Sequence, residues 1–364
     1  MKIKGCVALK MNGRKGKRII AAFVSVLLVF SFAGVFAVSA EVSDTDTLIP
    51  GGMAFGVKFF TEGAIVLGTT GVETASGIIS PAKDAGIRAG DIIVRAGGKE
   101  FENANELISM ISGSGGKPIA IAYLRDGVEG SATVTPARDA ENGCYRIGVL
   151  VRDSTAGIGT VTFIDPKTLD FGGLGHGIYD NETATLLPLS RGSVVEVEIT
   201  DVVRSERNAP GELKGSFGKR LVGELWENSE QGVFGRLSQM PETKYGAIPV
   251  AKRGEVKEGS ARVLTTLSNE GIGEYEIEIE HIYSGSGSVK NFLIKVTDER
   301  LLSKTGGIVQ GMSGSPIIQN GKLVGAVTHV LVDDPTRGYG IFIGNMLDSA
   351  FDASASQVST LLAA

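Results

Sequence analysis

The stretch GMSGSP, Gly311 to Pro316, places a serine among residues that favour tight turns. One interpretation is a plain turn between two strands, for which Gly, Ser and Pro suffice. The other is that Ser313 is a nucleophile on a tight loop, with backbone N–H groups exposed beside it. A serine hydroxyl attacks a carbonyl only when a base takes its proton. The choice therefore depends on whether the chain supplies a base, an orienting acid and a suitable fold.

The chain has three histidines that could act as that base. His176 lies in the glycine-dense segment FGGLGHGIYD, where the backbone can expose an imidazole, and it is the candidate base. His281 stands among alternating strand residues and is expected to be an ordinary strand side chain. His329 follows the candidate nucleophile in AVTHVL, and a strand histidine and a substrate-binding residue are both open interpretations.

An acid that holds the second nitrogen of the base would complete a catalytic triad. Asp298 follows the apolar run NFLIKVT, and a position at a strand end suits a carboxylate aimed into a cleft. Other aspartates remain alternatives, because the residue pattern alone does not choose among them. These are Asp165, Asp170, Asp180 and Asp201.

The order His, Asp, Ser is that of chymotrypsin-like proteases, which gives the serine loop a physical task. The N–H groups of Gly311 and Ser313 are predicted to hold the oxyanion of a tetrahedral intermediate. Met312 stands where digestive proteases have an aspartate, so their activating ion pair is not available to this chain. The analogy also predicts the residues that line the substrate pocket: Thr328, His329, Val330, Gly338, Tyr339 and Gly340.

The composition is that of a folded protein with an unusual leader. The chain has 364 residues, 51 of them glycine, and a net charge of −5, which fits two domains rich in strands and turns. The sequence has no basic stripe of the kind that nucleic-acid-binding proteins carry, so binding to nucleic acid is not predicted. Cys6 and Cys144 have no metal-site spacing, a disulfide between them is not expected, and nothing predicts a metal or an organic cofactor.

The first forty residues resemble an export or anchoring segment. Residues 1–18 carry seven basic side chains and no acidic one, and residues 19–40 carry no charge. A helix of this length spans roughly 30 Å of hydrocarbon, and the basic end stays cytoplasmic. A transmembrane anchor and a signal peptide cleaved after Ala40 are both possible readings. Either way, the rest of the chain is expected to face an extracytoplasmic space.

A linker, residues 41–50, is predicted to lead into a PDZ domain at residues 51–138. The run AGIRAGDII, Ala85 to Ile93, resembles the PDZ pattern and is followed by a helical segment from about Asn103. The resemblance implies a groove in which a peptide strand adds to a sheet edge. The C-terminal carboxylate of that peptide is expected to bind the backbone N–H groups of the loop Gly52, Met53, Ala54, Phe55 and Gly56. Alternatively, this domain only packs on its neighbour.

Residues 139–364 are predicted to form a second domain, made mainly of strands. Tyr275 to Glu280 alternates cleanly between apolar and acidic side chains, which indicates a half-exposed strand. Many such runs with glycine turns favour a β-barrel or a pair of barrels. A helix is expected only near the end, at residues 344–362.

Three segments together resemble the SpoIVB peptidase family: Val296 to Ile343 with TGGIVQGMSGSPI, the segment GHGIYD, and APGELKGSFG at Ala209 to Gly218. An N-terminal anchor followed by a PDZ domain also fits that family. The resemblance implies a chymotrypsin-like double β-barrel serine peptidase. It further implies that Ser313 is the nucleophile, His176 the base and Asp298 the orienting acid.

The family's biology is implied by the resemblance alone. It predicts a sporulation endopeptidase in the space between forespore and mother-cell membranes. The enzyme would cleave itself, and then a membrane-bound regulator of an intramembrane protease, so that a late mother-cell sigma factor becomes active. Two alternatives remain. One is an envelope quality-control protease of HtrA type, and the other is a non-catalytic, membrane-anchored PDZ scaffold.

Overall fold

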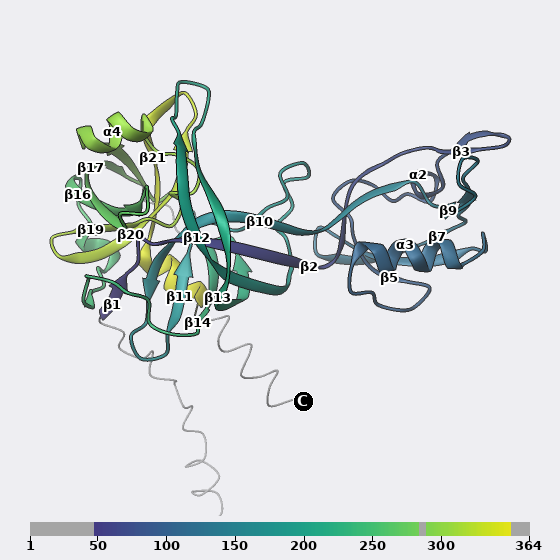
Figure 1. The fold of residues 1–364 in the computed structure, drawn as a ribbon, viewed down its shortest axis with the longest axis horizontal. Helices are drawn as coiled ribbons and strands as arrows, with labels where there is room; N and C mark the ends of the chain where they lie inside the picture. The colour runs from purple at the N-terminus through teal and green to yellow at the C-terminus, as the bar shows by residue number, and fades with distance from the viewer. Residues whose placement is uncertain (1–46, 284–288, 351–364) are drawn as a thin grey trace, which may run out of the picture. The chain divides into compact units, whose positions relative to one another are not determined.

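The computed structural model describes residues 47–283 and 289–350 (Figure 1). The predicted basic segment 1–18, the apolar segment 19–40 and most of the linker 41–50 lie outside these residues. Within them, no helix has the length and apolar character needed to cross a membrane. The described part of the chain is built mainly from strands, as the glycine-rich pattern predicted.

Six strands close into a first barrel. The ring closes because β2 pairs with both β10 and β12, while β11, β14 and β13 complete the circuit. The strands are β2 (Ala54–Thr69), β10 (Val149–Ile164), β11 (Asp170–Gly173), β12 (Leu189–Val203), β13 (Glu212–Ser229) and β14 (Gly232–Leu237). Two short strands, β1 (Thr47–Pro50) and β15 (Ile248–Pro249), extend this sheet beside β10. Phe59, Phe171 and Val233 are fully buried inside.

A second closed barrel follows in the chain, in the order β16-β17-β18-β21-β20-β19. The strands are β16 (Gly259–Thr266), β17 (Ile272–Ile282), β18 (Phe292–Val296), β19 (Pro316–Gln319), β20 (Lys322–Leu331) and β21 (Asp334–Phe342). In β17 Ile277 and Ile279 are buried while Glu276 and Glu278 are exposed, which confirms the predicted half-exposed strand. A short 3₁₀ helix, η1 (Arg253–Glu255), precedes this barrel, and residues 343–350 after it are helical. The remainder of the helix predicted at 344–362 lies outside the described residues.

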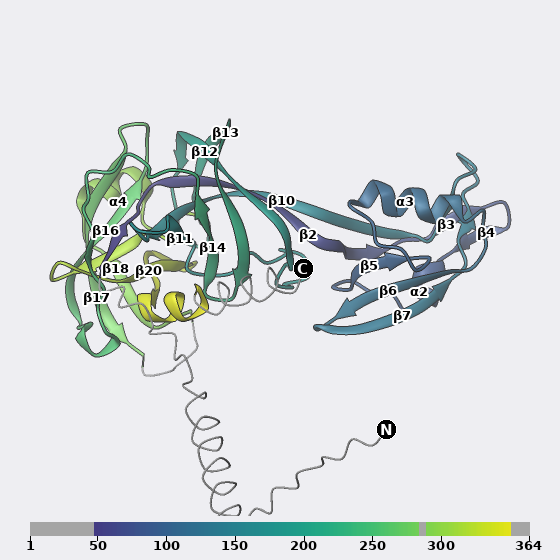
Figure 2. The ribbon, with the colours of Figure 1, turned by 90° about the horizontal axis from the view of Figure 1, so that it is seen from below.

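The PDZ domain is inserted into a hairpin of the first barrel. Strands β2 and β10 pair along their length and lead from the barrel into the PDZ domain (Figure 2). Between them lie β3 (Val72–Thr74), β4 (Gly77–Ile79), α2 (Pro81–Asp84), β5 (Ile92–Ala96), α3 (Ala104–Gly113), β6 (Ile119–Arg125), β7 (Val128–Val134), β8 (Ala137–Arg138) and β9 (Tyr145–Arg146). The predicted boundaries 51–138 and 139–364 therefore do not separate the two folds, since β1 and the first half of β2 belong to the barrel.

The PDZ domain has its own hydrophobic core, and Ile93, Leu107 and Ile121 are fully buried in it. The Asp of the AGDII pattern, Asp91, is also fully buried. Its carboxylate accepts two hydrogen bonds of 2.7 Å from Arg125 and one of 2.9 Å from the Arg88 N–H. The pattern thus marks a buried ion pair that closes the turn before β5.

The prediction that Gly52 to Gly56 form the carboxylate-binding loop of the PDZ domain has to be corrected. In the structure this segment enters the first barrel, where Gly56 lies opposite Ile158 on one side and Val195 on the other. A Cβ atom on Gly56 would approach the Phe217 ring to 2.4 Å, so this glycine is needed for packing. The prediction was wrong because a glycine-bearing loop before a strand looks the same in either domain.

Helix α4 (Glu299–Thr305) connects the second barrel to the serine loop, and Asp298 is its N-cap. The carboxylate accepts from the N–H groups of Arg300 and Leu301, and from the N–H of Glu276 at 3.2 Å. The Arg300 guanidinium donates to it at 2.7 Å and, with these N–H groups, lowers its pKa to about 2. The helix ends at Gly306 in the left-handed region, with φ of 74°.

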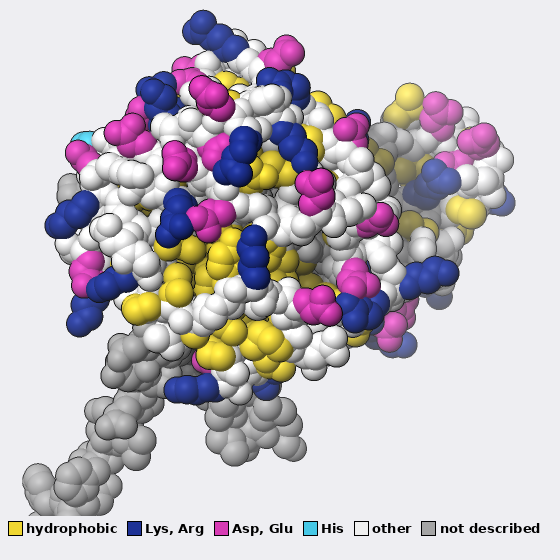
Figure 3. Space-filling view, turned by 60° about the vertical axis from the view of Figure 1, so that its left-hand side comes forward, with side chains coloured by type: hydrophobic (Ala, Val, Ile, Leu, Met, Phe, Trp, Pro, Cys, Tyr) yellow, Lys and Arg dark blue, Asp and Glu magenta, His cyan; other side chains and the backbone are white. Residues whose placement is uncertain are grey.

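The surface of the described residues mixes charges of both signs. Figure 3 shows Lys and Arg interspersed with Asp and Glu around a central gathering of hydrophobic side chains. Several charged side chains form exposed pairs, such as Arg220 with Glu196. Exposed pairs of this kind contribute little to stability.

The lowered pKa of Asp298 predicts a pH-dependent contribution to stability. Because its folded pKa lies near 2, below the unfolded value, the ionised group stabilises the fold above about pH 4, and this stabilisation is lost as the pH falls toward 2. Asp298→Asn keeps a residue that caps helices but removes the charge. We expect its unfolding free energy in urea to fall by on the order of 1 kcal/mol at pH 7, and the difference to shrink at pH 2.5.

The matched control is Asp126→Asn, because that side chain is 91% exposed and lies 3.9 Å from Arg88. It should leave the stability unchanged at both pH values. A deficit of Asp298→Asn that stays equal at pH 7 and pH 2.5 would contradict the account of the cap.

Candidate active site

Ser313 lies on a tight turn just before β19. Gly311 and Gly314 flank it with φ of 96° and 92°, in the region that favours glycine. At Gly314 a Cβ atom would come within 2.1 Å of the Thr160 carbonyl oxygen and 2.4 Å of the Leu174 nitrogen. The Ser313 hydroxyl is half-buried and donates to the Thr328 carbonyl at 2.8 Å. The GMSGSP segment is therefore a strained turn pressed against the first barrel.

Two buried threonines of β10 hold this turn. Thr160 Oγ1 donates to the Gly311 carbonyl at 2.8 Å, and the Thr160 N–H donates to the Ser313 carbonyl at 3.0 Å. Thr162 Oγ1 donates to the Gly314 carbonyl at 2.7 Å. Both threonines are fully buried, so these bonds are shielded from water. Ser313 comes from the second barrel, but the first barrel holds its turn in place.

The backbone N–H groups of the turn differ in whether they have a hydrogen-bond acceptor. Gly314 N–H donates to Val327 and Ser315 N–H to Met312. The N–H groups of Gly311 and Ser313 have no acceptor among the described residues. Met312 is buried at 1% exposure in the apolar core of the second barrel, where an aspartate would be costly. The role of Gly311 and Ser313 as oxyanion donors stays a prediction that this geometry accommodates.

His176 is brought beside the serine turn by the segment after β11. The N–H of Leu174 donates to the Thr160 carbonyl at 3.2 Å, so the strand that holds Ser313 also holds the histidine loop. Nδ1 of His176 lies 2.8 Å from the Gly177 carbonyl oxygen, which suits an Nδ1–H tautomer with Nε2 left to accept a proton. Burial lowers the pKa of His176, so the ring is neutral at pH 7 and fit to act as a base.

His329 is the second imidazole at this place. Its ring centroid lies 4.9 Å from that of His176, and the two ring planes are tilted by 39°. It follows Thr328, whose carbonyl accepts the bond from Ser313. Burial, together with His176 and Lys290, lowers the pKa of His329 to about 4.

None of the candidate acids contacts His176 among the described residues. Asp298 caps α4 and pairs with Arg300. Asp180 is fully buried as a side chain but bonds to Arg152 at 2.9 Å and to the N–H of Thr183. The remaining three pair elsewhere: Asp165 with the N–H of Lys167, Asp170 with Arg236 and Asp201 with the N–H of Val202. This geometry does not support Asp298 as the orienting acid.

The predicted pocket residues gather on β20 and β21, close to the serine turn. Thr328 is buried and donates to the Val289 and Tyr339 carbonyls at 3.1 and 3.2 Å. A Cβ on Gly340 would meet the Phe292 ring at 2.2 Å, which makes this glycine a packing residue rather than an open wall. Gly338 faces Ile308 and lies opposite Val330. The side chains with access to a substrate are therefore His329, Val330 and Tyr339, each half-buried.

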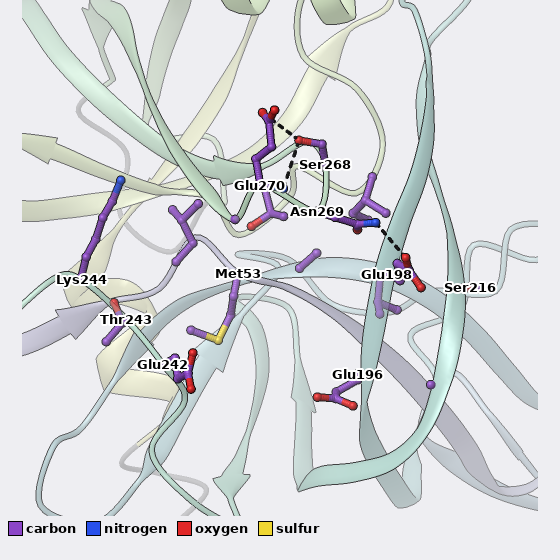
Figure 4. Close-up of a pocket in the computed structure, with 17 residues that line it drawn as sticks. Met53, Glu196, Glu198, Ser216, Glu242, Thr243, Lys244, Ser268, Asn269 and Glu270 are labelled. Atoms are coloured by element: carbon purple, nitrogen blue, oxygen red, sulfur yellow. Dashed lines mark hydrogen bonds between the residues drawn. The ribbon is translucent and has the colours of Figure 1, made fainter.

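A large open cleft of about 940 Å³ lies away from the serine turn and is lined by residues of both barrels (Figure 4). Neither Ser313 nor His176 lines it. Its acidic side chains include Glu196, Glu242 and Glu270, and Met53, from the segment first assigned to the PDZ groove, also lines it. No group of three or more His, Cys, Asp or Glu in the described ranges is arranged to hold a metal.

Comparisons with known proteins agree with this architecture. A family profile described as SpoIVB peptidase S55 matches residues 143–347, and a PDZ-domain profile matches residues 76–125. A putative zinc metalloprotease of Lactococcus lactis subsp. lactis (strain IL1403) is 32% identical over 106 residues, which are 29% of this chain and 24% of that relative. The chain thus matches about a quarter of that relative's length.

Solved structures with some likeness include the active form of the Rv3671c protease from M. tuberculosis. It is 15% identical, with 55% of this chain and 74% of that chain covered and a TM-score of 0.33. The HtrA-type protease AlgW with a decapeptide is 9% identical, with 56% and 55% covered and a TM-score of 0.33. The SpoIVB profile spans more than half of the 364 residues. The chain therefore belongs to the SpoIVB peptidase S55 family and is a serine peptidase that carries a PDZ domain.

Proposed function

We propose that this serine peptidase is an endopeptidase of a sporulation signalling checkpoint, with Ser313 as nucleophile and His176 as general base. The observation that carries the catalytic part is the shared anchor of the two groups: Thr160 bonds to Gly311, to Ser313 and to Leu174. A turn with φ near 96° and 92° beside a neutral, half-buried imidazole is more than a strand connection requires.

The chemistry follows from the positions of these groups. His176 Nε2 takes the proton from Ser313 Oγ as the oxygen attacks the peptide carbonyl. The Gly311 and Ser313 N–H groups then hold the oxyanion. His176 returns the proton to the leaving amine, and a water molecule repeats the sequence to release the acyl group. In the resting geometry Ser313 must first leave the Thr328 carbonyl, since its hydroxyl donates there.

The biological setting is carried by family membership and by the leader sequence. We infer that residues 19–40 anchor or export the protein, and that the peptidase acts between the forespore and mother-cell membranes. Its substrates would be the chain itself and a membrane-bound regulator of an intramembrane protease, whose cleavage activates a late mother-cell sigma factor. No cofactor enters this chemistry.

The PDZ domain is proposed to select these protein substrates through a strand edge. Between Val149 and Ser154, β10 pairs with β2 alone, and Gly148 before it has φ of 72°. Helix α3 lies beside this part of β10, where the Ala104 N–H donates to Asp153 at 2.7 Å. Ile108 and Leu150 are exposed at 54% and 56%. A peptide strand added here would bury them, as in other strand-addition sites.

An HtrA-like quality-control role is the second candidate, since both classes combine a serine peptidase with a PDZ domain. In HtrA proteases the PDZ domain follows the protease domain, whereas here it is inserted between β2 and β10. That difference favours the checkpoint role. The non-catalytic scaffold is disfavoured because Thr160 holds both the turn of Ser313 and the segment that leads to His176.

Ser313→Ala should abolish self-cleavage and peptide hydrolysis, because the other hydroxyl of the turn, that of Ser315, is fully buried and out of reach of a substrate. Loss of a triad nucleophile typically lowers the rate by roughly 10⁴-fold or more. The measurement is fragment mass mapping of the purified full chain together with hydrolysis of a reporter peptide. Ser303→Ala, on exposed α4, is the matched control. Self-processing by the Ser313→Ala protein would contradict the proposal.

Asp298→Asn tests whether Asp298 orients His176, as the family resemblance implies, or only caps α4, as in the structure. We expect this variant to keep activity within about fivefold of wild type, because Asp298 contacts Arg300 and the start of α4 rather than His176, and asparagine preserves the cap. If Asp298 orients His176, the rate falls by roughly 10⁴-fold. Steady-state kinetics on correctly folded protein, checked by near-UV circular dichroism, distinguishes the two results.

Leu150→Glu should impair the binding of protein substrates but leave the catalytic step unchanged, because it places a charge on the proposed peptide-binding edge. We expect slower cleavage of protein substrates, and unchanged kcat/KM for a short reporter peptide. Val128→Glu, at another exposed apolar position of the PDZ domain, is the control. Equal loss of reporter hydrolysis in Leu150→Glu would mean that the edge supports the fold rather than binding peptides.

A further inference from the structure

A cleft opens where the strands β2 and β12 separate. Toward its start, β2 pairs with β12 as far as Gly56, which lies opposite Val195. Beyond that point β2 follows β10 instead, and Ala54 lies opposite Thr160. The next residues of β12, Glu196 to Ile199, therefore have β13 on one side and no described strand on the other. These residues line the open cleft of about 940 Å³ that Figure 4 shows.

The cleft reaches the backbone edge of β12 and not only one of its faces. Successive side chains of a strand point to opposite faces, yet every residue from Glu196 to Ile199 lines the cleft. A cavity that touches consecutive strand residues lies along the edge of that strand. Unpaired N–H and C=O groups at such an edge can pair with a further extended chain. The cleft thus offers a place for strand addition, which is a recurrent mode of peptide recognition.

The lining of the cleft combines apolar and acidic side chains. Met53 just before β2, Val197 on β12 and Ile272 at the start of β17 are apolar and half-buried. Among the acidic side chains of the lining, Glu196 pairs with Arg220, which lies outside it. An extended peptide that alternates apolar and basic residues would match both kinds of lining, since its side chains alternate between two faces. The acidic side chains are all exposed: Glu196, Glu198, Glu242 and Glu270.

The other carboxylates of the cleft have no basic side chain paired with them. Glu198 accepts a hydrogen bond of 2.8 Å from the neutral amide of Asn269. Glu242 and Glu270 form no ion pair within residues 47–283 and 289–350. Lys244 is the one basic residue of the lining, and Figure 4 shows its side chain extending away from Glu242. The cleft therefore keeps negative charge that a basic partner would complement.

We propose that this cleft is an exosite, a substrate-binding site apart from the catalytic residues, for an extended segment of a protein substrate that carries Lys or Arg and adds as a strand to the free edge of β12. The turn Ser268 to Gly271 and the segment around Glu242 form its other sides. The inference rests on the proposed peptidase function. Ala54 of the lining pairs with Thr160, which holds the turn of Ser313. A substrate bound here is thus held beside the strand that neighbours the anchor of the nucleophile.

Acidic side chains beside a strand edge also have a simpler explanation. Charges at an edge can serve only to keep other strands away and so prevent aggregation. In that case no peptide binds the cleft, and removing the charges would make the chain associate with itself. If the cleft is an exosite, the charges select a basic partner, and removing them weakens the binding of that partner. The two explanations therefore predict opposite effects of the same substitutions.

The test measures peptide binding by fluorescence anisotropy to the full chain that carries Ser313→Ala, so that the probes stay intact. The main probe is a peptide of about ten alternating Lys and Val residues, with acetyl and amide ends, so that no terminal carboxylate takes part. A second probe has Glu in place of Lys. A third keeps every side chain of the main probe but is N-methylated at its central Lys and Val, which removes donors from both edges. We expect the second and third probes to bind at least roughly tenfold more weakly than the main probe.

Substitutions in the cleft show where the main probe binds. Glu242→Gln together with Glu270→Gln should weaken its binding by roughly threefold to tenfold, because each exposed ion pair contributes little. Glu242→Lys together with Glu270→Lys should bind the Glu–Val probe better than the Lys–Val probe. Glu206→Gln with Glu278→Gln, exposed and outside the lining, is the matched control and should bind as before. Leu150→Glu at the proposed PDZ edge should also leave this binding unchanged.

Hydrolysis of the short reporter peptide by the active chain gives a second readout. The Lys–Val probe should leave kcat/KM for the reporter within about twofold, because Ser313 does not line the cleft. Competitive inhibition of the reporter would place the probe in the catalytic site and overturn the exosite. Tighter binding of a peptide with the sequence of residues 1–18 than of the Lys–Val probe would make the occupant the chain's own basic segment instead of a substrate.

The remaining results decide between the exosite and simple edge protection. Equal binding of the Lys–Val probe to the unsubstituted cleft and to the Glu→Gln pair, or no binding at millimolar probe, would overturn the exosite. Equal binding of the N-methylated probe would overturn strand addition. If Ser313→Ala still hydrolyses the reporter, the proposed peptidase mechanism fails while the probe can still bind the cleft. The two failures are therefore distinguishable.

Discussion

The site depends on one strand of the first barrel holding pieces of both barrels. Thr160 and Thr162 of β10 bind the carbonyls of Gly311, Ser313 and Gly314, while the Thr160 carbonyl accepts from Leu174. Each such bond contributes about 1 kcal/mol net, but a buried unpaired partner costs more. The strained turn of Ser313 persists because these buried bonds leave its carbonyls no better arrangement. The same bonds set where the loop of His176 begins.

Strand β10 also connects this anchor with the PDZ domain. Its first residues pair with the outer half of β2, and its last residues carry the two threonines. The register of the β2–β10 ladder shifts twice, between Leu150 and Val151 and between Arg152 and Ser154. Such irregularities bend and twist a ribbon locally. The PDZ domain is thus joined to the barrel that holds the turn of Ser313 by two paired strands, β2 and β10, rather than by a single linker.

Local sequence signals predicted the features that local chemistry decides. The glycines around Ser313 marked a turn with positive φ, and the alternation of Tyr275 to Glu280 marked a half-exposed strand. Sequence patterns did not predict a residue's role correctly where the same pattern fits two different local structures. An aspartate between a strand and the run ERLLSK suits a helix cap as well as a catalytic acid, and the structure makes Asp298 the cap. The insertion of the PDZ domain into the β2–β10 hairpin depends on long-range pairing, which no short segment encodes. The pairing of His329 with His176 depends on a bulge for the same reason.

The proposed mechanism requires that β10 brings Ser313 and His176 together as a reactive pair. Labelling with a fluorophosphonate tests this directly, because the reagent forms an Oγ–phosphorus bond only with an activated serine. Mass mapping should locate the label on Ser313 in the wild-type chain and find it greatly reduced in His176→Ala. Labelling of a different serine, or equal labelling of Ser313 without His176, would contradict the account.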